Sequence, residues 1–194
     1  MTGTSCRIGI LLAIPMTPAF AQEHWASDSF TEEVAIKFAG TWVHGASSIP
    51  SALRDSIVSD TVVLRLYSDL LLGRRNSDLP WDPSTAMYFL AMSGDPQWIP
   101  VLDLYTRDPP RPCYDGCLPM AAYGLALHPG DSTATARLEE LAVAGTYAQR
   151  HDLIGALTLV RDSSALALLA QMNTAGLTAS DTSRIRHALE EGPQ

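Results

Sequence analysis

Residues 94–102 read Gly94-Asp95-Pro96-Gln97-Trp98-Ile99-Pro100-Val101-Leu102, a short break followed at once by an apolar segment. Glycine readily adopts the left-handed conformation that closes a helix. The Asp95 carboxylate can accept hydrogen bonds from the free N–H groups of a following helix and suits its positive end. Pro96 falls at the first helical position, where its missing N–H costs nothing. The run therefore predicts two helices joined by a tight turn.

The break at Asp95 is one of four similar breaks. The others are Ser59-Asp60-Thr61, Gly130-Asp131-Ser132 and Arg161-Asp162-Ser163. The four aspartates, which we expect to cap the second helix of each pair, lie 35, 36 and 31 residues apart. A period in the thirties is typical of repeats that consist of two helices each.

The apolar positions keep the same register around each break. Seven and ten residues after the aspartates stand Tyr67, Leu102, Leu138, Leu169, Leu70, Tyr105, Leu141 and Met172. Five residues before them stand Asp55, Leu90, Ala126 and Leu157. The last three units therefore agree on both helices, whereas the first agrees only on its second helix. An apolar period near 3.6 residues predicts an all-α fold.

These breaks and the helices after them resemble the HEAT-like repeats of the α-solenoid class. The resemblance covers roughly residues 50–173 and is strongest at 84–105. It implies a short right-handed α-solenoid of about four antiparallel helix pairs over residues 49–194, and a surface that binds other proteins. The first and fourth breaks lack glycine and proline, and the last spacing is short, so an irregular helical bundle is the alternative.

The first residues predict export. One basic residue, Arg7, precedes an apolar run from Ile8 to Phe20, which ends in the small-x-small pattern Ala19-Phe20-Ala21. This order is typical of a secretory signal peptide, and the run is too short to span a bilayer as a helix. We expect cleavage of residues 1–21, no stable membrane insertion afterwards, and an extracytoplasmic location, periplasmic or secreted. The alternative is an uncleaved anchor.

Two further helices are predicted at the ends of the repeat domain. Residues 22–48 form an N-terminal segment in which a capping box, Ser29 to Glu32, starts a helix that ends near residue 43. A final helix, from about Ser180 to Glu190, has one apolar side and a polar remainder. Polar-faced helices of this kind suit the ends of a helical stack, where the last repeat must face water.

The charge balance bears on the class of partner. The chain has 13 Lys and Arg against 21 Asp and Glu, a formal net charge of −8. Nucleic-acid binding calls for clustered basic residues, and the groups Arg74-Arg75 and Arg107/Arg111 are too small for that. The charge balance therefore predicts no nucleic-acid partner, whereas a protein partner is what the HEAT-like resemblance implies.

Cys113 and Cys117 are the cysteines that remain after export. They lie in a proline-rich loop, residues 106–117, where a turn at Asp115-Gly116 can bring them together. In an oxidising compartment such a pair predicts a disulfide that shapes the loop. A copper-binding thiol pair and a redox-active disulfide are the less favoured alternatives, because known copper chaperones with a similar motif have a thioredoxin-like fold.

No catalytic residue or cofactor site is predicted. The chain contains neither a Gly-x-Ser-x-Gly elbow nor a phosphate-binding glycine loop, and no two histidines lie three or four residues apart. His151-Asp152 superficially resembles the motif of HD-type phosphohydrolases, with His128 before it and Asp162 or Asp181 after it. We therefore expect a non-enzymatic interaction or scaffold module, with a metal-dependent hydrolase that uses His151 and Asp152 as the alternative.

Overall fold

The computed structural model describes residues 35–36, 39–40, 51–113 and 116–194, and these residues contain helices and no strand. The all-α prediction is thus confirmed for this part of the chain. The predicted signal peptide, residues 1–21, lies outside the described residues, as does most of the predicted helix 29–43. Within that helix, Ala35, Ile36 and Ala39 are helical and buried.

Four helix pairs meet at the four predicted breaks. The pairs are α3 (Ser51–Ser59) with α4 (Thr61–Leu71), α5 (Pro83–Met92) with α6 (Ile99–Arg107), α7 (Cys117–Ala126) with α8 (Ser132–Ala144), and α9 (Tyr147–Val160) with α10 (Ser163–Gln171). A short 3₁₀ turn, η2 (Pro96–Trp98), leads into α6, and α11 (Ala179–Glu191) follows the last pair. The predicted breaks therefore lie between helices.

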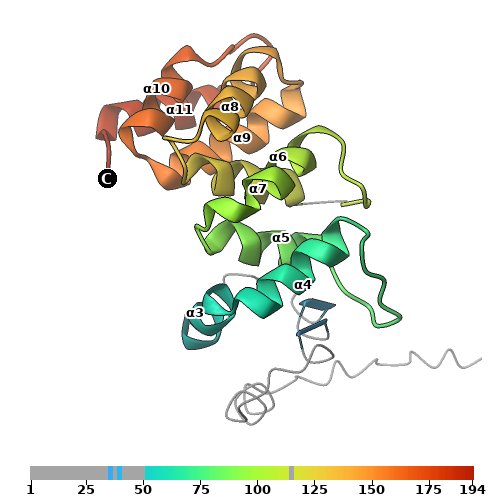
Figure 1. The fold of residues 1–194 in the computed structure, drawn as a ribbon. Coiled ribbons are helices and arrows are strands. Elements are labelled where there is room, and N and C mark those ends of the chain that lie inside the picture. Colours follow the sequence, from blue (N-terminus) through green and yellow to red (C-terminus); the bar gives the residue numbers. More distant parts are fainter. Residues whose placement is uncertain (1–34, 37–38, 41–50, 114–115) are drawn as a thin grey trace, which may run out of the picture. The chain divides into compact units, whose positions relative to one another are not determined.

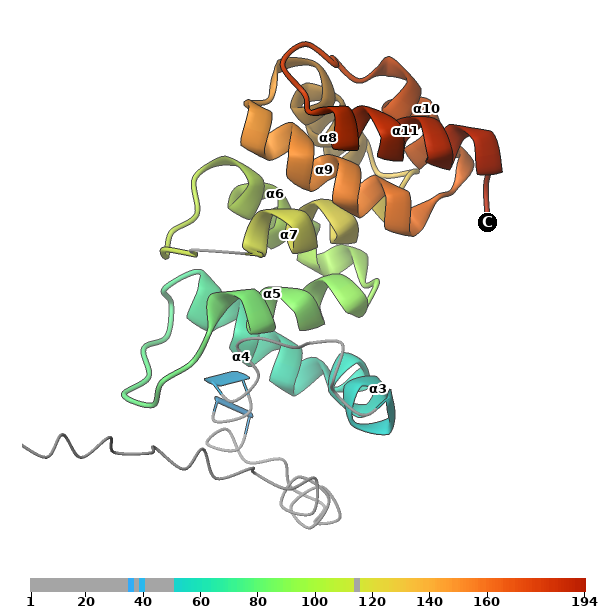
Figure 2. The same cartoon turned by 180° about the vertical axis from the view of Figure 1, so that it is seen from behind.

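The helices of residues 51–194 contact one another in two series (Figures 1 and 2). The first helices of successive pairs pack in chain order, α3 on α5, α5 on α7 and α7 on α9, and α11 extends this series. We call α5, α7, α9 and α11 the first layer. The second helices α6, α8 and α10 also contact their neighbours in order and form the second layer. In both series, a helix therefore packs against the equivalent helix of the next pair along the chain.

Each break aspartate bonds to the N-terminus of the helix that follows it. Asp60 accepts hydrogen bonds from the backbone N–H of Val62 at 2.9 Å and of Val63 at 3.2 Å. Asp95, Asp131 and Asp162 accept equivalent bonds from Gln97, from Thr133 and Ala134, and from Ala165. These bonds use N–H groups that have no partner within the helix.

The first helix of a pair is closed by a left-handed glycine, as predicted, at only one of the two breaks that contain glycine. Gly94 has a positive φ of 61°, as expected, but Gly130 does not. There the chain turns over residues 128–131, and the Asp131 N–H donates to the His128 carbonyl at 3.0 Å. At the fourth break Arg161 itself adopts the left-handed conformation, with φ 49°.

The last helix, α11, lies where it is predicted, from about Ser180 to Glu190, and extends one residue further at each end. Its N-cap is Thr178, whose hydroxyl accepts a bond from the Asp181 N–H at 3.1 Å. The Asp181 carboxylate in turn accepts the Thr178 N–H at 3.3 Å, which completes a capping box. Asp181 therefore lies at the third helical position.

The core follows the register of the repeats. All eight residues at positions seven and ten after the break aspartates are buried, and so are Leu90, Ala126 and Leu157 before the breaks. Two buried tyrosines also bond across units: Tyr67 donates to the Ala35 carbonyl at 3.0 Å and Tyr105 to the Leu71 carbonyl at 2.8 Å. Burial raises the pKa of Tyr105 to about 12, so this hydroxyl stays protonated as a donor.

Arginine side chains join successive units. Arg111 donates to the Asn76 side chain at 2.7 Å, and Arg150 donates to the Gly145 and Ala175 carbonyls. Arg161 donates to the Gly192 carbonyl at 2.8 Å and pairs with Glu191 at 2.7 Å. The loops and ends of neighbouring helix pairs are thus held to one another by charge-assisted hydrogen bonds.

Candidate functional site

The outward side of α5 and α7 carries no charged side chain. Seven of the partly exposed residues of these helices define this side: Ser84, Tyr88 and Met92 on α5, and Pro119, Met120, Tyr123 and Leu127 on and just after α7. We call these seven residues the uncharged face. Residues spaced by three or four lie on one side of a helix, so Met120, Tyr123 and Leu127 form a single stripe. The opposite sides of both helices are buried in the core.

The second layer is different because its helices carry charged side chains that pair with one another. Arg107 on α6 lies 3.1 Å from Asp103 and 3.3 Å from Glu140 of α8. Arg137 is almost fully buried and bonds to Glu140 at 2.7 Å and to the Thr106 hydroxyl at 2.7 Å. A shallow pocket of about 280 Å³ lies beside these groups. Its charges are already paired, so it offers no unpaired charge to a ligand.

One edge of the uncharged face has a charged neighbour. Arg54 of α3 interacts with Tyr88 of α5 and with Asp55, and these contacts raise the pKa of Arg54 above its ordinary value.

His151, the residue of the hydrolase alternative, bonds to Asp181 of α11, one of the two aspartates that the resemblance to HD-type phosphohydrolases offered with it. The His151 Nδ1 lies 2.8 Å from the Asp181 carboxylate, which is only 1% exposed. Hydrogen bonds from Thr178, followed by the contact with His151, hold the pKa of Asp181 below its usual value. Asp162 caps α10 instead. Among the described residues, no group of three or more His, Cys, Asp or Glu side chains is placed to hold a metal ion.

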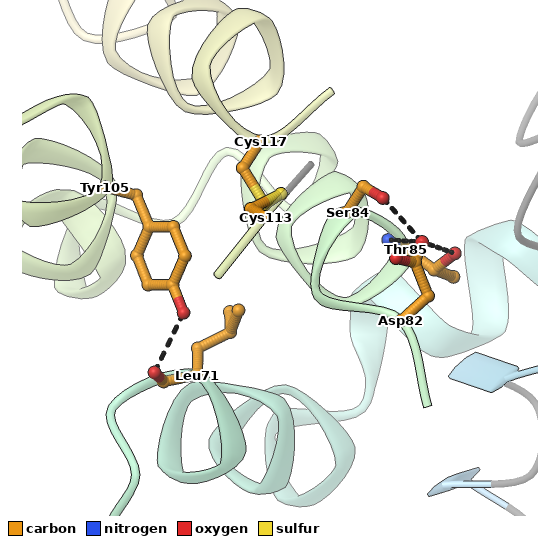
Figure 3. Close-up of a disulfide and its surroundings, with 7 residues drawn as sticks. All are labelled: Leu71, Asp82, Ser84, Thr85, Tyr105, Cys113 and Cys117. Atoms are coloured by element: carbon orange, nitrogen blue, oxygen red, sulfur yellow. Dashed lines mark hydrogen bonds between the residues drawn. A yellow bond between two sulfur atoms is a disulfide. The ribbon is translucent and has the colours of Figure 1, made fainter. Parts of the chain in front are cut away.

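Cys113 and Cys117 form a disulfide, with a Cα–Cα distance of 6.0 Å. Figure 3 shows the bridge beside the start of α5, where Asp82 accepts bonds from Ser84 and Thr85, and beside Tyr105, whose hydroxyl bonds to Leu71. Cys117 is the first residue of α7 and is 5% exposed, whereas Cys113 is partly exposed. The predicted disulfide is therefore present, and it joins the α6–α7 loop to the start of α7.

Trp81 lies in the loop before α5. The Arg111 guanidinium lies over its ring, 5.7 Å from the centroid. Trp98 is buried. Neither tryptophan is fully exposed, so neither stands out as an anchor for a partner.

Across the described segments, no helix is long and apolar enough to cross a membrane. Comparison with known proteins found no match to a family model, a curated protein or a solved structure. The function must therefore be inferred from the side chains and their arrangement.

The uncharged face is the feature that we did not predict from the sequence. A signal for it was nonetheless present, because residues 117–127, which precede the break at Gly130-Asp131 where a helix is expected, contain no charged side chain. A helix that is apolar on all sides is either fully buried or covered by a partner. Only the burial of its neighbours shows which side of α7 faces outward.

Proposed function

We propose that this protein is an extracytoplasmic, non-enzymatic interaction module, built as a short right-handed α-solenoid of HEAT-like repeats, which binds another protein through the uncharged face. The observation that carries the proposal is the contrast between the outward side of α5 and α7 and the helices of the second layer. The outward side of α5 and α7 has no charged side chain that would have to lose its water when a partner binds. The second layer, in contrast, carries paired charged side chains. The order of helix contacts, α5 to α7 to α9 to α11, supports the solenoid arrangement.

The composition of the uncharged face suits a protein partner. Protein interfaces are depleted of charged residues at their centre and enriched in Tyr and Met. Tyr88 and Tyr123 offer large rings with a polar hydroxyl, and Met92 and Met120 adapt to irregular surfaces. Burying such side chains releases about 25 cal/mol per Å² of apolar surface. The expected partner presents an apolar, uncharged patch of its own.

The test compares two charge-introducing variants. Tyr123→Glu places a carboxylate in the uncharged face, and Val62→Glu places one on α4, where Val62 is 76% exposed. Each tagged protein is used for affinity capture from the envelope fraction, after circular dichroism has shown that it is folded. We expect a protein that is captured by the wild type and by Val62→Glu and lost with Tyr123→Glu. Equal capture by all three would contradict a role for this face.

The alternative function, a metal-dependent hydrolase that uses His151 and Asp152, is supported by one observation. A histidine that ligates a metal usually donates its other ring N–H to a carboxylate, as His151 can to Asp181. Metal analysis of the purified protein tests it. Stoichiometric metal that is lost in His151→Ala would favour the hydrolase over the interaction module.

A further inference from the structure

A second pocket lies between α8 and α10, two helices of the second layer that contact each other (Figure 1). Its volume is about 200 Å³, and a cavity of about 150 Å³ already holds a benzene molecule. Its floor is apolar and buried, and it is formed by Ala126, Leu138, Leu157 and Ala165. The pocket shares no residue with the uncharged face, and it has room for one side chain of a partner.

The rim of this pocket is polar. Glu139 of α8 and Ser164 and Gln171 of α10 line it, and all three are exposed. Within the described part of the chain, none of the three side chains makes a hydrogen bond or an ion pair. Glu139 is the only charged residue among those that line the pocket. The rim therefore offers a partner one negative charge and two neutral polar groups.

The preceding junction of the second layer, between α6 and α8, shows how an equivalent carboxylate is paired. Asp103 of α6 and Glu139 of α8 both stand eight residues after the break aspartate of their own unit. Arg107 pairs with Asp103 at 3.1 Å, and the Nε of Arg137 lies 3.9 Å from the same carboxylate. The chain itself therefore supplies two guanidinium groups beside Asp103.

Apolar residues replace both arginines at the junction between α8 and α10. The position of Arg137, six residues after the break aspartate, is taken by Leu168, which lines the pocket. The position of Arg107, twelve residues after the break aspartate, is taken by Val143, which is 59% exposed. Glu139 thus keeps the acidic position of the preceding unit without the cations that accompany it there.

We propose that the pocket between α8 and α10 binds an arginine side chain of a partner protein, whose guanidinium pairs with Glu139 while its stem packs on the apolar floor. Arginine side chains bury their methylene stem along apolar surface and keep the charged head in a polar environment. The planar guanidinium presents five N–H donors in a fork that matches a carboxylate. The donors that remain can bond to the oxygens of Ser164 and Gln171.

Arginine fits this rim better than lysine does. The lysine ammonium is a point charge with three donors and without the planar fork, so it matches a carboxylate and two further acceptors less well. The site is additional to the uncharged face, and it does not depend on the function proposed for that face.

The first test asks whether the pocket recognises the charge of the guanidinium. The probe is the capped peptide acetyl-Gly-Gly-Arg-Gly-Gly-amide, and its control carries citrulline, which has nearly the same shape and no charge. Each peptide is titrated into the isotope-labelled full chain, and amide NMR spectra are recorded. We expect the arginine peptide to shift the signals of Glu139 and Ala165 in a saturable manner. Equal shifts with both peptides, or no shift with either, would overturn the proposal.

The second test removes the carboxylate in one of two matched variants. Glu139→Gln and Glu190→Gln each remove one negative charge from an exposed helix position, but Glu190 lies on α11 and does not line the pocket. We expect the dissociation constant of the arginine peptide to rise about fivefold in Glu139→Gln, as for an ion pair close to water. It should stay unchanged in Glu190→Gln. An unchanged dissociation constant in Glu139→Gln would contradict the assigned site.

The third test supplies the cation from the chain itself. Leu168→Arg places a guanidinium at the position that Arg137 has in the preceding unit, and Leu168→Met keeps an apolar side chain there. After circular dichroism has shown that both are folded, we expect the arginine peptide to bind Leu168→Met and no longer Leu168→Arg. Undiminished binding by Leu168→Arg would place the peptide elsewhere. The comparison at Glu139 stands independently of this pair, because Glu139 is exposed and its substitution disturbs no packing.

Discussion

Arg137 is a buried charged side chain between the second and third helix pairs. It is 5% exposed, and its guanidinium donates to the hydroxyl and the carbonyl of Thr106 and pairs with Glu140. Arg107, the last residue of α6, pairs with the same Glu140, but its side chain is half-exposed. The two arginines therefore differ in burial while sharing a partner.

We expect Arg137→Met to lower the free energy of unfolding by about 2 kcal/mol, because the buried Thr106 oxygens lose their donors. Arg107→Met should leave the free energy of unfolding unchanged within error, since exposed ion pairs contribute little. Urea unfolding followed by circular dichroism measures both. Equal losses in the two variants would mean that burial does not decide the contribution of these pairs.

Asp181 links the stability of the C-terminal region to pH. Bonds from Thr178 and the contact with His151 lower its folded-state pKa, whereas in the unfolded chain it titrates near the ordinary value of about 3.9. Its contribution is therefore present above that ordinary value and is lost as pH falls through the lowered pKa. We expect the difference in melting temperature between wild type and Asp181→Asn to shrink below about pH 4. A difference that stays constant down to pH 2 would contradict this assignment.

At the scale of helices, two glycines predict opposite effects of the same substitution. A Cβ on Gly124 of α7 would lie 3.0 Å from the Ala91 Cα and Cβ of α5 and 2.8 Å from Leu102. A Cβ on Gly155 of α9 would meet only the mobile end of Arg184, at 3.7 Å. Gly124 thus permits close packing of α5 on α7, whereas Gly155 has no such role.

Gly124→Ala should therefore destabilise the protein by about 1–3 kcal/mol through overpacking. Gly155→Ala should stabilise it by about 0.5–1 kcal/mol, because alanine favours the helix and the site has room. Thermal and urea unfolding of the two variants test the pair. Stabilisation by both would mean that α5 moves away from α7 at little cost.

The bridge between Cys113 and Cys117 contributes modestly to stability. A closed loop of five residues restricts the unfolded chain by about 2 kcal/mol at most in the chain-entropy relation. Reduction should lower the free energy of unfolding by no more than this and leave the helix content of the protein unchanged. Circular dichroism before and after reduction measures the helix content, and urea unfolding followed by the same signal measures the free energy of unfolding. Loss of helix on reduction would show that the bridge holds α7 in place.

At the scale of the whole molecule, what could be predicted from the sequence depends on where the physical cause lies. The breaks could be predicted because Asp60, Asp95, Asp131 and Asp162 each bond to backbone N–H groups only two or three residues further along the chain. The buried positions could be predicted because apolar residues recur at helical spacing. The sequence left open whether Asp162 or Asp181 lies beside His151, since that choice depends on how α11 packs on α9. The uncharged face was missed for the same reason: which side of α7 faces outward is decided by α5 and α9.

The proposed solenoid and the alternative irregular bundle differ in how far a local defect spreads. In a stack of repeats each unit contacts only its neighbours, so stability is a sum of local terms. Ile185 of α11 is 7% exposed and packs at the C-terminal end of the first layer. Ile185→Ala should weaken hydrogen-exchange protection in α9, α10 and α11 and leave α4 and α5 unchanged under native conditions. A bundle with one shared core would instead lose protection in α4 and α5 by the same amount. The truncation Ile185→Val gives a milder series in which the same gradient along the chain should appear, since it removes a single methylene.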